Sequence, residues 1–432
     1  MTLNSEKEKL IFYYFPVILF SLLPFFLITG PFLSDLSISL IGLIFLAYCF
    51  KEKNFTYFKN KYFYFFLFFW LYLIINILVN NFNLDSLGTA FVYVRYGIFV
   101  VAVVFLLDTD SKFIKYFFYC IFVCFSALIL DGFYQYFVGE NVFGFKTPDS
   151  YRVASFFNDE QILGHYLSRL WPIFFGLSIL IFKQKNVLFY FLVLIFILSE
   201  TLIFLSGDRT AFFYINLSAI FVILFSQKLL RLRLFTLLSS IVLIVIISFI
   251  NPIATERVFD KTLSQMNIVN ENSKEQEEIY IFSKEHTHHY ITSYKMFLDN
   301  KLLGVGIKNF RNYCSNEKYI ESQYSCSTHP HNTYMQILAE TGIIGFIFLL
   351  TVFIYFCHYV VKHLILRFKG TFYFNDFEIC VLSGVVIFLW PLVPTLNVFN
   401  NWINIATIIN LPFLFWSIKS SLNIKYNSIR NS

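Results

Sequence analysis

The sequence predicts an all-α membrane protein with about twelve transmembrane helices. Of its 432 residues, 57% are hydrophobic and only 14% are charged. Because a water-soluble domain needs more polar side chains to cover its surface, most of this surface has to face lipid. The apolar residues also fall in runs of roughly 20, the length that a helix needs to cross the hydrocarbon core of a membrane.

Twelve apolar segments of this kind follow one another along the chain. They cover residues 10–29, 31–50, 62–82, 88–107, 113–138, 161–182, 187–205, 210–227, 234–251, 337–361, 378–396 and 399–418. The first lacks the small-residue cleavage site of a signal peptide, so we expect it to be retained as a helix. The chain then divides into helices 1–9 over residues 1–251, a loop subdomain over 252–331, and helices 10–12 with a tail over 332–432.

Positive charge alternates between the connections. Lys and Arg gather in every second connection and near both termini, for example at Lys51, Lys115 and Arg233. By contrast, the short connection at 206–209 carries only Arg209. Under the positive-inside rule, the basic connections and both termini are cytoplasmic. The net charge of +6 follows from this topology and gives no reason to expect a nucleic-acid partner.

The opposite side carries the two long connections, residues 139–160 and 252–331. We expect the second to fold outside the membrane, partly as helix. It contains Cys314 and Cys326, whereas the remaining cysteines fall in apolar segments. In an oxidising compartment these two thiols are expected to form a disulfide, and two unpaired thiols are the alternative.

Polar side chains run into one apolar helix in the stretch CSTHPHNTYMQILAETGIIG. Asn332 suits a helix N-cap, and Asn332, Gln336 and Glu340 then repeat every four residues along one face. His329 and His331 precede them at the mouth of the helix. A carboxylate in a membrane segment usually faces a protein cavity, and histidine is the usual general base near neutral pH. The alternative is a histidine pair anchored among lipid headgroups above a structural glutamate.

Other candidates lie where apolar segments begin on the same side. Arg209 stands alone in SGDRTA, where a guanidinium and the free N–H groups of a helix start together suit a phosphate. A snorkelling arginine is the alternative. The remaining polar or glycine-rich candidates are Arg152, Asp159, Glu160, Gly304 and Gly306, the glycines forming a turn whose backbone can approach a ligand. We expect no metal, because the histidines of HTHHY have no partner ligands in the sequence.

Three motifs taken together, SGDRT, LLGVGIKNF and HPHNTYMQILAETGIIGF, resemble the O-antigen ligase and O-antigen polymerase family. RVASFFNDEQILG and PTLNVFNNW also resemble segments of that family, so the similarity spans most of the chain. Its members are polytopic bacterial enzymes that act on polyprenyl-diphosphate-linked glycans at the periplasmic face. The resemblance therefore implies a GT-C-like helical fold in the inner membrane, a periplasmic active site, and no cofactor or metal.

The resemblance also implies roles for particular residues. His331 matches the catalytic histidine of the family, and Arg209 matches the arginine that contacts the donor diphosphate. Glu340 and Asn332 would orient the histidine and the mouth of the helix.

One position departs from the family pattern. Ligases of this family usually carry a second arginine in the loop before the GVG motif, and His286 stands at that place here. The second cation of the diphosphate site is then a protonated His286, or Arg152, Lys146 or Arg311 in its place.

Three activities share this donor chemistry: ligation of O-antigen to lipid A–core, polymerisation of repeat units, and glycosylation of proteins. We expect a ligase that inverts the anomeric carbon, with a polyprenyl-diphosphate-linked glycan as donor and lipid A–core or another glycan as acceptor. A transporter or flippase of lipid-linked glycans is the alternative of a different class. Transporters usually show inverted repeats and broken midplane helices, whereas the polar residues here gather at one membrane face.

Overall fold

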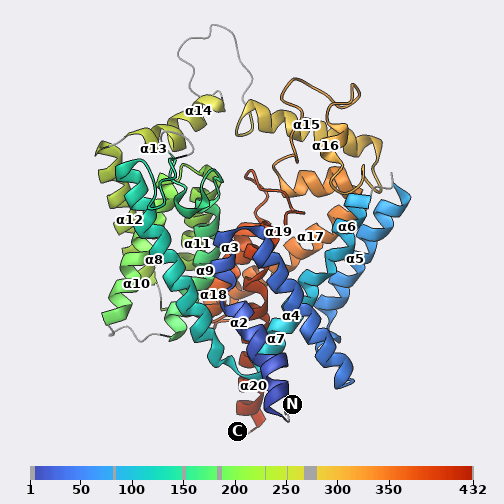
Figure 1. The fold of residues 1–432 in the computed structure, drawn as a ribbon, viewed down its shortest axis with the longest axis vertical. Helices are drawn as coiled ribbons and strands as arrows, with labels where there is room; N and C mark the ends of the chain where they lie inside the picture. Colours follow the sequence, from blue (N-terminus) through green and yellow to red (C-terminus); the bar gives the residue numbers. More distant parts are fainter. Residues whose placement is uncertain are drawn as a thin grey trace.

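The computed structural model describes residues 5–80, 84–147, 152–181, 187–228, 230–250, 252–266 and 280–430. These residues form helices and turns, and the one β-bridge among them joins Glu140 to Lys146. Both ends of the chain lie at one end of the helix bundle, and the long 252–331 connection lies at the opposite end (Figure 1). We call the latter the loop end. The side of the membrane that the termini face stays a prediction.

Seven helical stretches among the described residues are long and apolar enough to cross a membrane. The bent pair Glu6–Ser21 and Leu23–Thr29 makes eight if it is counted as one span. The seven are α4 (Pro31–Lys51), α5 (Lys61–Val79), α6 (Leu84–Val92) with α7 (Val94–Thr109), the turn Ser111–Phe113 with α8 (Ile114–Val138), α12 (Leu230–Ile250), α17 (Thr333–Phe368), and α19 (Asn401–Ile408) with the start of α20 (Asn410–Arg430). The chain is thus an all-α, multi-pass membrane protein, as predicted.

Apart from the bent pair, the other predicted segments form helices that are not both long and apolar enough to count as spans, so the count of twelve stays a prediction. Together with the two of the bent pair, these helices are α2 (Phe15–Ser21), α3 (Leu23–Thr29), α9 (Leu163–Ile181), α10 (Val187–Leu205), α11 (Arg209–Phe225) and α18 (Asp376–Leu389). The amino-terminal helix α1 (Glu6–Lys9) continues through the π-helical turn Leu10–Tyr14 into α2. Further 3-10 turns cover Thr56–Phe58 and Ser155–Phe157. Each of the predicted apolar segments therefore contains helix.

Helix α9 forms the centre of the bundle. Every residue from Leu163 to Ser178 is buried, because α8, α10, α11, α18 and α19 pack around it. Protein rather than lipid surrounds this helix, which explains why it tolerates polar side chains. Arg169, for example, donates from Nη1 to Thr407 Oγ1 (3.3 Å) and stacks on the ring of Tyr214.

Arg233 lies elsewhere than the charge pattern predicted. We expected it in an exposed connection, but it is fully buried in the first turn of α12. Its Nη1 donates to Glu200 Oε1 on α10, and its guanidinium lies over the ring of Trp171, 4.4 Å from the ring centroid. A counter-charge and an aromatic face together make the burial tolerable. Helix α12 therefore begins at Leu230, before the apolar run does.

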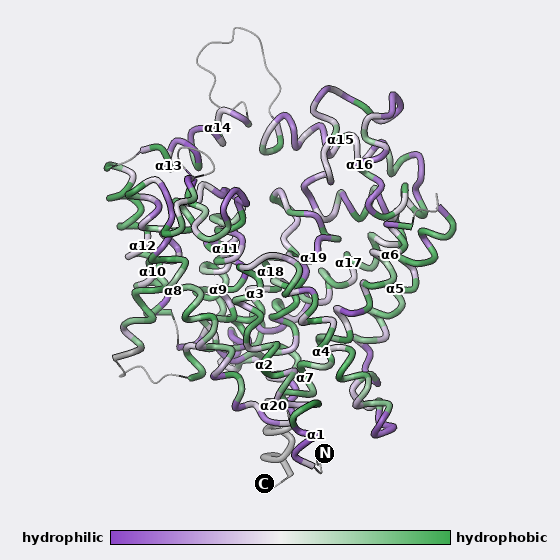
Figure 2. Tube along the Cα trace, viewed as in Figure 1, coloured by the Kyte–Doolittle hydropathy of each residue, from purple (hydrophilic) through white to green (hydrophobic). Residues whose placement is uncertain are grey.

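The loop end carries the polar helices. Figure 2 shows hydrophobic residues along most of the bundle and hydrophilic ones gathered at the loop end. Its short elements are α13 (Ile253–Thr255), the π-helical turn Glu256–Asp260, α14 (Lys261–Gln265), α15 (Lys284–Asp299) and α16 (Phe310–Tyr313). The loop is therefore partly helical, as predicted, and its residues 267–279 lie outside the described part of the chain. Helix α15 packs against α17, which brings the loop onto the membrane helices.

Candidate active site

Four histidine rings gather at the loop end, where α15 meets the segment before α17. We call His286, His289, His329 and His331 the histidine cluster. His331 is its centre: its ring centroid lies 4.1 Å from that of His329, 5.4 Å from that of His289 and 5.5 Å from that of His286. The fold thus joins HTHHY to HPHN, which lie far apart in the sequence. Among the described residues, no group of three or more His, Cys, Asp or Glu side chains is arranged to hold a metal ion.

A third segment fixes the backbone of this cluster. His331 has φ of 53°, in the left-handed region that residues other than glycine adopt rarely. Its carbonyl oxygen accepts a hydrogen bond from Thr395 N (2.7 Å), and its Nε2 lies 3.1 Å from Ser327 Oγ. His329 Nε2 lies 3.3 Å from the carbonyl oxygen of Thr395. Thr395, in the motif PTLNVFNNW, thus holds both histidines, and the unusual backbone conformation is typical of functional sites.

The histidines of the cluster are neutral at neutral pH. Burial, with the nearby His289, lowers the pKa of His331 from 6.5 to about 4. Burial and the neighbouring histidines likewise lower the pKa of His286 to about 4 and that of His329 to about 3. A neutral imidazole can accept a proton, as a general base must. A protonated His286, which the sequence allowed as the second cation, does not fit this lowered pKa.

Three arginines meet at the turn between α10 and α11. We call Arg152, Arg209 and Arg257 the arginine cluster. Gly207 is at the centre of the turn with φ of +63°, and a Cβ on it would lie 3.2 Å from Arg152 Cγ and 3.4 Å from Arg257 Cγ. Arg152 Nε also donates to the carbonyl oxygen of Ser206 (3.1 Å). The charges of Arg257 and Arg152 both act on Arg209.

Arg209 joins the arginine cluster to the loop. It is the first residue of α11, and Asp208 caps that helix by accepting a hydrogen bond from Ala211 N (3.1 Å). Arg209 Nη1 donates to Thr262 Oγ1 (3.0 Å) and Gln265 Oε1 (2.7 Å), both on α14. The short helical stretch after α12 is thereby held over the start of α11.

The arginine and histidine clusters are close enough for their charges to interact. The charge of Arg209 contributes to the low pKa of His286, and Glu285, next to His286 on α15, acts on Arg209 in turn. Arg311 likewise contributes to the low pKa of His329. The ring of His331 contacts both His286, on which Arg209 acts, and His329, on which Arg311 acts. A diphosphate held at Arg209 would lie beside the histidines.

A comparison with protein families agrees with this geometry. Residues 191–350 match a family model described as O-antigen ligase. The matched region is similar to that family over its whole length. It runs from α10 to α17 and so contains the histidine cluster, Arg209 and Arg257. A search of the curated proteins found no match to the chain.

Within the matched region, the polar stripe of α17 is present but faces the protein interior. Asn332 is the N-cap, as predicted, and accepts hydrogen bonds from Tyr334 N (2.9 Å) and Met335 N (3.1 Å). Its Nδ2 donates to the carbonyl oxygen of Pro391 (2.9 Å). Asn332 thereby joins the mouth of α17 to the segment that also holds the histidines.

Glu340 holds the loop rather than His331. Its Oε1 accepts from Phe310 N (3.1 Å) and its Oε2 from Gln336 Nε2 (3.1 Å), and the residue is fully buried. Gln336 in turn donates to Asn397 Oδ1 (2.9 Å). The expectation that Glu340 orients His331 is therefore not matched by its contacts, because its carboxylate points to the 304–310 segment.

Gly304 packs against the backbone of α17. We expected its backbone to approach a ligand instead. A Cβ on Gly304 would lie 2.5 Å from the carbonyl oxygen of Ala339. Val305 N donates to that same oxygen (2.9 Å), and Gly306 N donates to the carbonyl oxygen of Glu340 (3.0 Å). Helix α17 is broken here at Gly342, whose φ is 62°. The GVG and ETG motifs of the family thus meet as two backbones in contact.

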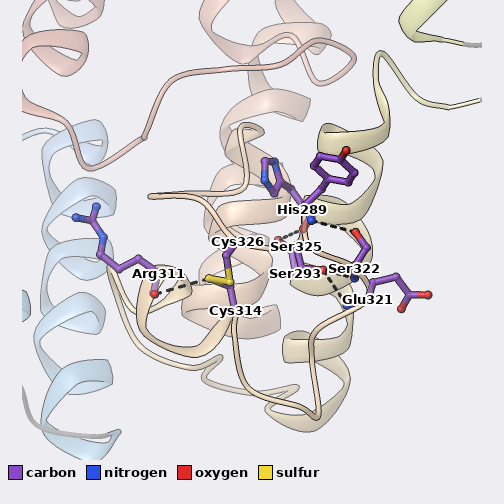
Figure 3. The surroundings of a disulfide bond; sticks show 9 residues. His289, Ser293, Arg311, Cys314, Glu321, Ser322, Ser325 and Cys326 are labelled. Atoms are coloured by element: carbon purple, nitrogen blue, oxygen red, sulfur yellow. Dashed lines mark hydrogen bonds between the residues drawn. A yellow bond between two sulfur atoms is a disulfide. The ribbon is translucent and has the colours of Figure 1, made fainter.

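The remaining predicted residues lie around this centre. Arg311 points away from the cysteine pair and from His289 in Figure 3, and its charge acts on His329. Cys314 and Cys326 lie at disulfide distance, with their Cα atoms 5.0 Å apart, and join α16 to the segment that leads to the cluster. Asp159 and Glu160 are exposed before α9 and enter neither cluster of the described residues.

Sequence reasoning missed the residues that place Arg152. On α8, Gln135 Oε1 accepts from Ala154 N (2.9 Å) and Ser155 N (2.7 Å). Asp131 Oδ2 accepts from Ser155 Oγ (2.6 Å). These two polar residues stand four positions apart in the otherwise apolar segment 113–138, and that spacing could have identified them as a pair facing the protein. Arg257 was missed as well, because nothing around it in the sequence shows which turn it faces.

Proposed function

We propose that this protein transfers a glycan from a polyprenyl-diphosphate carrier to a sugar hydroxyl at the periplasmic face of the bacterial inner membrane. Ligation of O-antigen to lipid A–core is the activity that we favour. The observation that carries the proposal is the position of the arginine cluster beside a cluster of neutral histidines. The match of residues 191–350 to the O-antigen ligase family supports it.

The proposed reaction is a single displacement. The oxygen of the acceptor hydroxyl forms a bond to the anomeric carbon of the donor while the bond from that carbon to the diphosphate oxygen breaks. The electron pair of the broken bond leaves with the prenyl diphosphate, and the hydroxyl proton passes to His331. A displacement of this kind inverts the anomeric configuration, and no metal or cofactor takes part in it.

The charges at the site suit both ends of this reaction. The leaving diphosphate gains negative charge in the transition state, and fixed guanidiniums at Arg209 and Arg152 stabilise it. The same diphosphate favours a proton on the nearby histidines, so donor binding raises the pKa of His331 from its low value in the free protein. A base that is neutral before binding and more basic afterwards is what proton removal from a hydroxyl requires.

The division of the chain follows from this placement. The membrane helices of residues 1–251 and 332–432 hold the prenyl chain and the diphosphate. The loop of residues 252–331 carries His286, His289, His329 and His331 and covers the acceptor side. Polymerisation of repeat units and glycosylation of proteins use the same donor, so they remain alternatives within this chemistry.

A broken membrane helix is also a feature of transporters, and α17 is broken at Gly342. In this protein the backbone of the loop occupies the break: Ile343 N donates to the carbonyl oxygen of Lys301 (2.8 Å). A transporter would instead use such a break to bind its substrate near the midplane. The occupied break therefore favours an enzyme.

Genetic complementation tests the proposal. The gene is deleted in its host and restored as wild type, His331→Asn or Arg209→Ala at equal membrane levels. Asparagine is chosen because it tolerates the left-handed backbone that His331 adopts. Lys295→Ala is the control for Arg209→Ala, because it removes a positive charge outside both clusters, where Lys295 pairs with Glu321.

The lipopolysaccharide ladder and the prenyl-linked glycan are then resolved for each strain. A ligase predicts that both site variants lose the ladder and accumulate full-length glycan on the carrier, with rescue by wild type and Lys295→Ala only. A single repeat unit left on the core would indicate a polymerase. Full rescue by both site variants would contradict the enzymatic role and favour the transporter.

A further inference from the structure

We propose that Arg257 binds the donor diphosphate together with Arg209 and Arg152, as the third guanidinium of that site. This inference rests on the proposed function, because it assigns a residue to the donor site of that same reaction. It concerns a residue of the loop that no motif marks.

The first support is the convergence of three elements on one turn. Arg152 comes from the segment before α9, Arg209 begins α11, and Arg257 lies in the π-helical turn after α13. The side chains of Arg152 and Arg257 both lie against Gly207, where a Cβ would be 3.2 Å from one and 3.4 Å from the other. Any larger residue at Gly207 would crowd both guanidinium stems.

The second support is that Arg257 is held in place. The hydrogen bonds from Arg209 to Thr262 and Gln265 tie α14 to α11. Arg257 lies about one helical turn before Thr262 in the same helical stretch. These bonds therefore also fix the position of Arg257 relative to Gly207. Both Arg152 and Arg257 have further interactions within the protein, and the proposal depends on their charge and position rather than on vacant donors.

The third support is the charge balance. The charges that act on Arg209 include two other arginines and two carboxylates, Asp208 and Glu285. Asp208 is already engaged, because it caps α11 and its Oδ2 lies 3.2 Å from His165 Nε2. Guanidiniums placed this close repel one another, and a bound anion offsets that repulsion. A diphosphate has several oxygen acceptors, so it suits a site with three guanidiniums better than a site with a single guanidinium.

Binding to the purified full-length protein in lipid nanodiscs tests this inference. The probes are a C55 prenyl diphosphate without glycan and the corresponding prenyl monophosphate. The variants are Arg257→Ala, Arg257→Lys and Arg209→Ala. Lys295→Ala is the matched control, because it removes a positive charge from the same loop where Lys295 pairs with Glu321.

Arg257→Ala is expected to weaken diphosphate binding roughly tenfold to hundredfold, the effect of losing a charge-assisted hydrogen bond. The monophosphate is expected to be affected less, so the preference for the diphosphate falls. Arg257→Lys restores part of the affinity because it keeps the charge, and Lys295→Ala binds like the wild type. A purely structural role for Arg257 would not change the preference between the two lipids.

Three results would overturn the inference, and each has a different consequence for the proposed function. Wild-type affinity in Arg257→Ala with loss in Arg209→Ala removes Arg257 from the site and leaves the proposed function intact. Equal loss of both lipids in Arg257→Ala and Arg257→Lys, with a lower melting temperature, assigns Arg257 a structural role. A wild-type protein that does not prefer the prenyl diphosphate removes the proposed function and this inference together.

Discussion

The contact between Gly304 and α17 gives the sharpest prediction about the fold of the site. A Cβ on Gly304 would lie 2.5 Å from the carbonyl oxygen of Ala339 and 2.5 Å from the carbonyl carbon of Glu340. Both are backbone atoms of a helix that the 301–306 segment pairs with, so neither can move aside alone. Gly304 also has φ of +68°, which disfavours alanine whatever the space.

The expected cost of Gly304→Ala is the sum of these two effects. Holding alanine in the left-handed conformation costs about 1–2 kcal/mol. Forcing an extra methyl group into a packed contact costs typically another ~1–3 kcal/mol, at the upper end here because backbone must shift. Gly370→Ala isolates the first effect, because Gly370 has φ of +76° and no atom within 4 Å of its added Cβ.

Thermal unfolding in detergent compares the two variants. Gly304→Ala is expected to be less stable than Gly370→Ala by roughly 2–3 kcal/mol, the cost of the packed contact alone. It should also lose transfer activity, since Glu340 and Phe310 hold this same segment. Equal stability of the two variants would show that the 301–306 segment does not contact α17 as described.

Three further predictions follow from single contacts. Cys314→Ser removes the cross-link to Cys326 and should lower unfolding stability by on the order of 3 kcal/mol, with reductant doing the same to the wild type; a variant that melts like the oxidised wild type would argue for unpaired thiols. Gln135→Leu leaves the N–H groups of Ala154 and Ser155 without an acceptor and should reduce donor affinity at normal membrane levels, and unchanged binding of prenyl diphosphate would dissociate this network from Arg152. Acid should destabilise the protein between about pH 6.5 and pH 4, because histidines of the unfolded chain take up protons at a higher pH than the buried His331 does. The effect should be smaller in His331→Asn. An identical pH dependence of melting in the wild type and in His331→Asn would refute the low pKa of His331.

The fold class and the centre of the site were predictable because they depend on local patterns. Runs of apolar residues identify membrane helices, and Asn332 is recognisable as an N-cap from its place before such a run. His331 and Arg209 were identified by motifs, and the structure places them in neighbouring clusters. Polar residues at the start of apolar helices thus pointed to the end of the bundle where the two clusters lie.

The remaining features depend on contacts between distant segments. The partner of Glu340 is a backbone N–H thirty residues earlier in the chain, and no spacing rule reveals it. Arg233 was misplaced because its counter-charge, Glu200, lies on another helix. Burial beside other histidines lowers the pKa of His286. The sequence does not reveal this burial, so a protonated His286 remained open at that stage. Each of these outcomes required the tertiary structure.

The most direct test of the central claim is transfer by the purified protein. Wild type, His331→Asn, Arg209→Ala and the control Lys295→Ala are given a polyprenyl-diphosphate-linked glycan and lipid A–core, and the linkage formed is analysed by NMR. We predict that wild type and Lys295→Ala form the linkage with inverted configuration and release prenyl diphosphate. His331→Asn should be slower by roughly a hundredfold or more, the usual contribution of a general base. A retained configuration, or a His331→Asn variant as fast as the wild type, would contradict the mechanism.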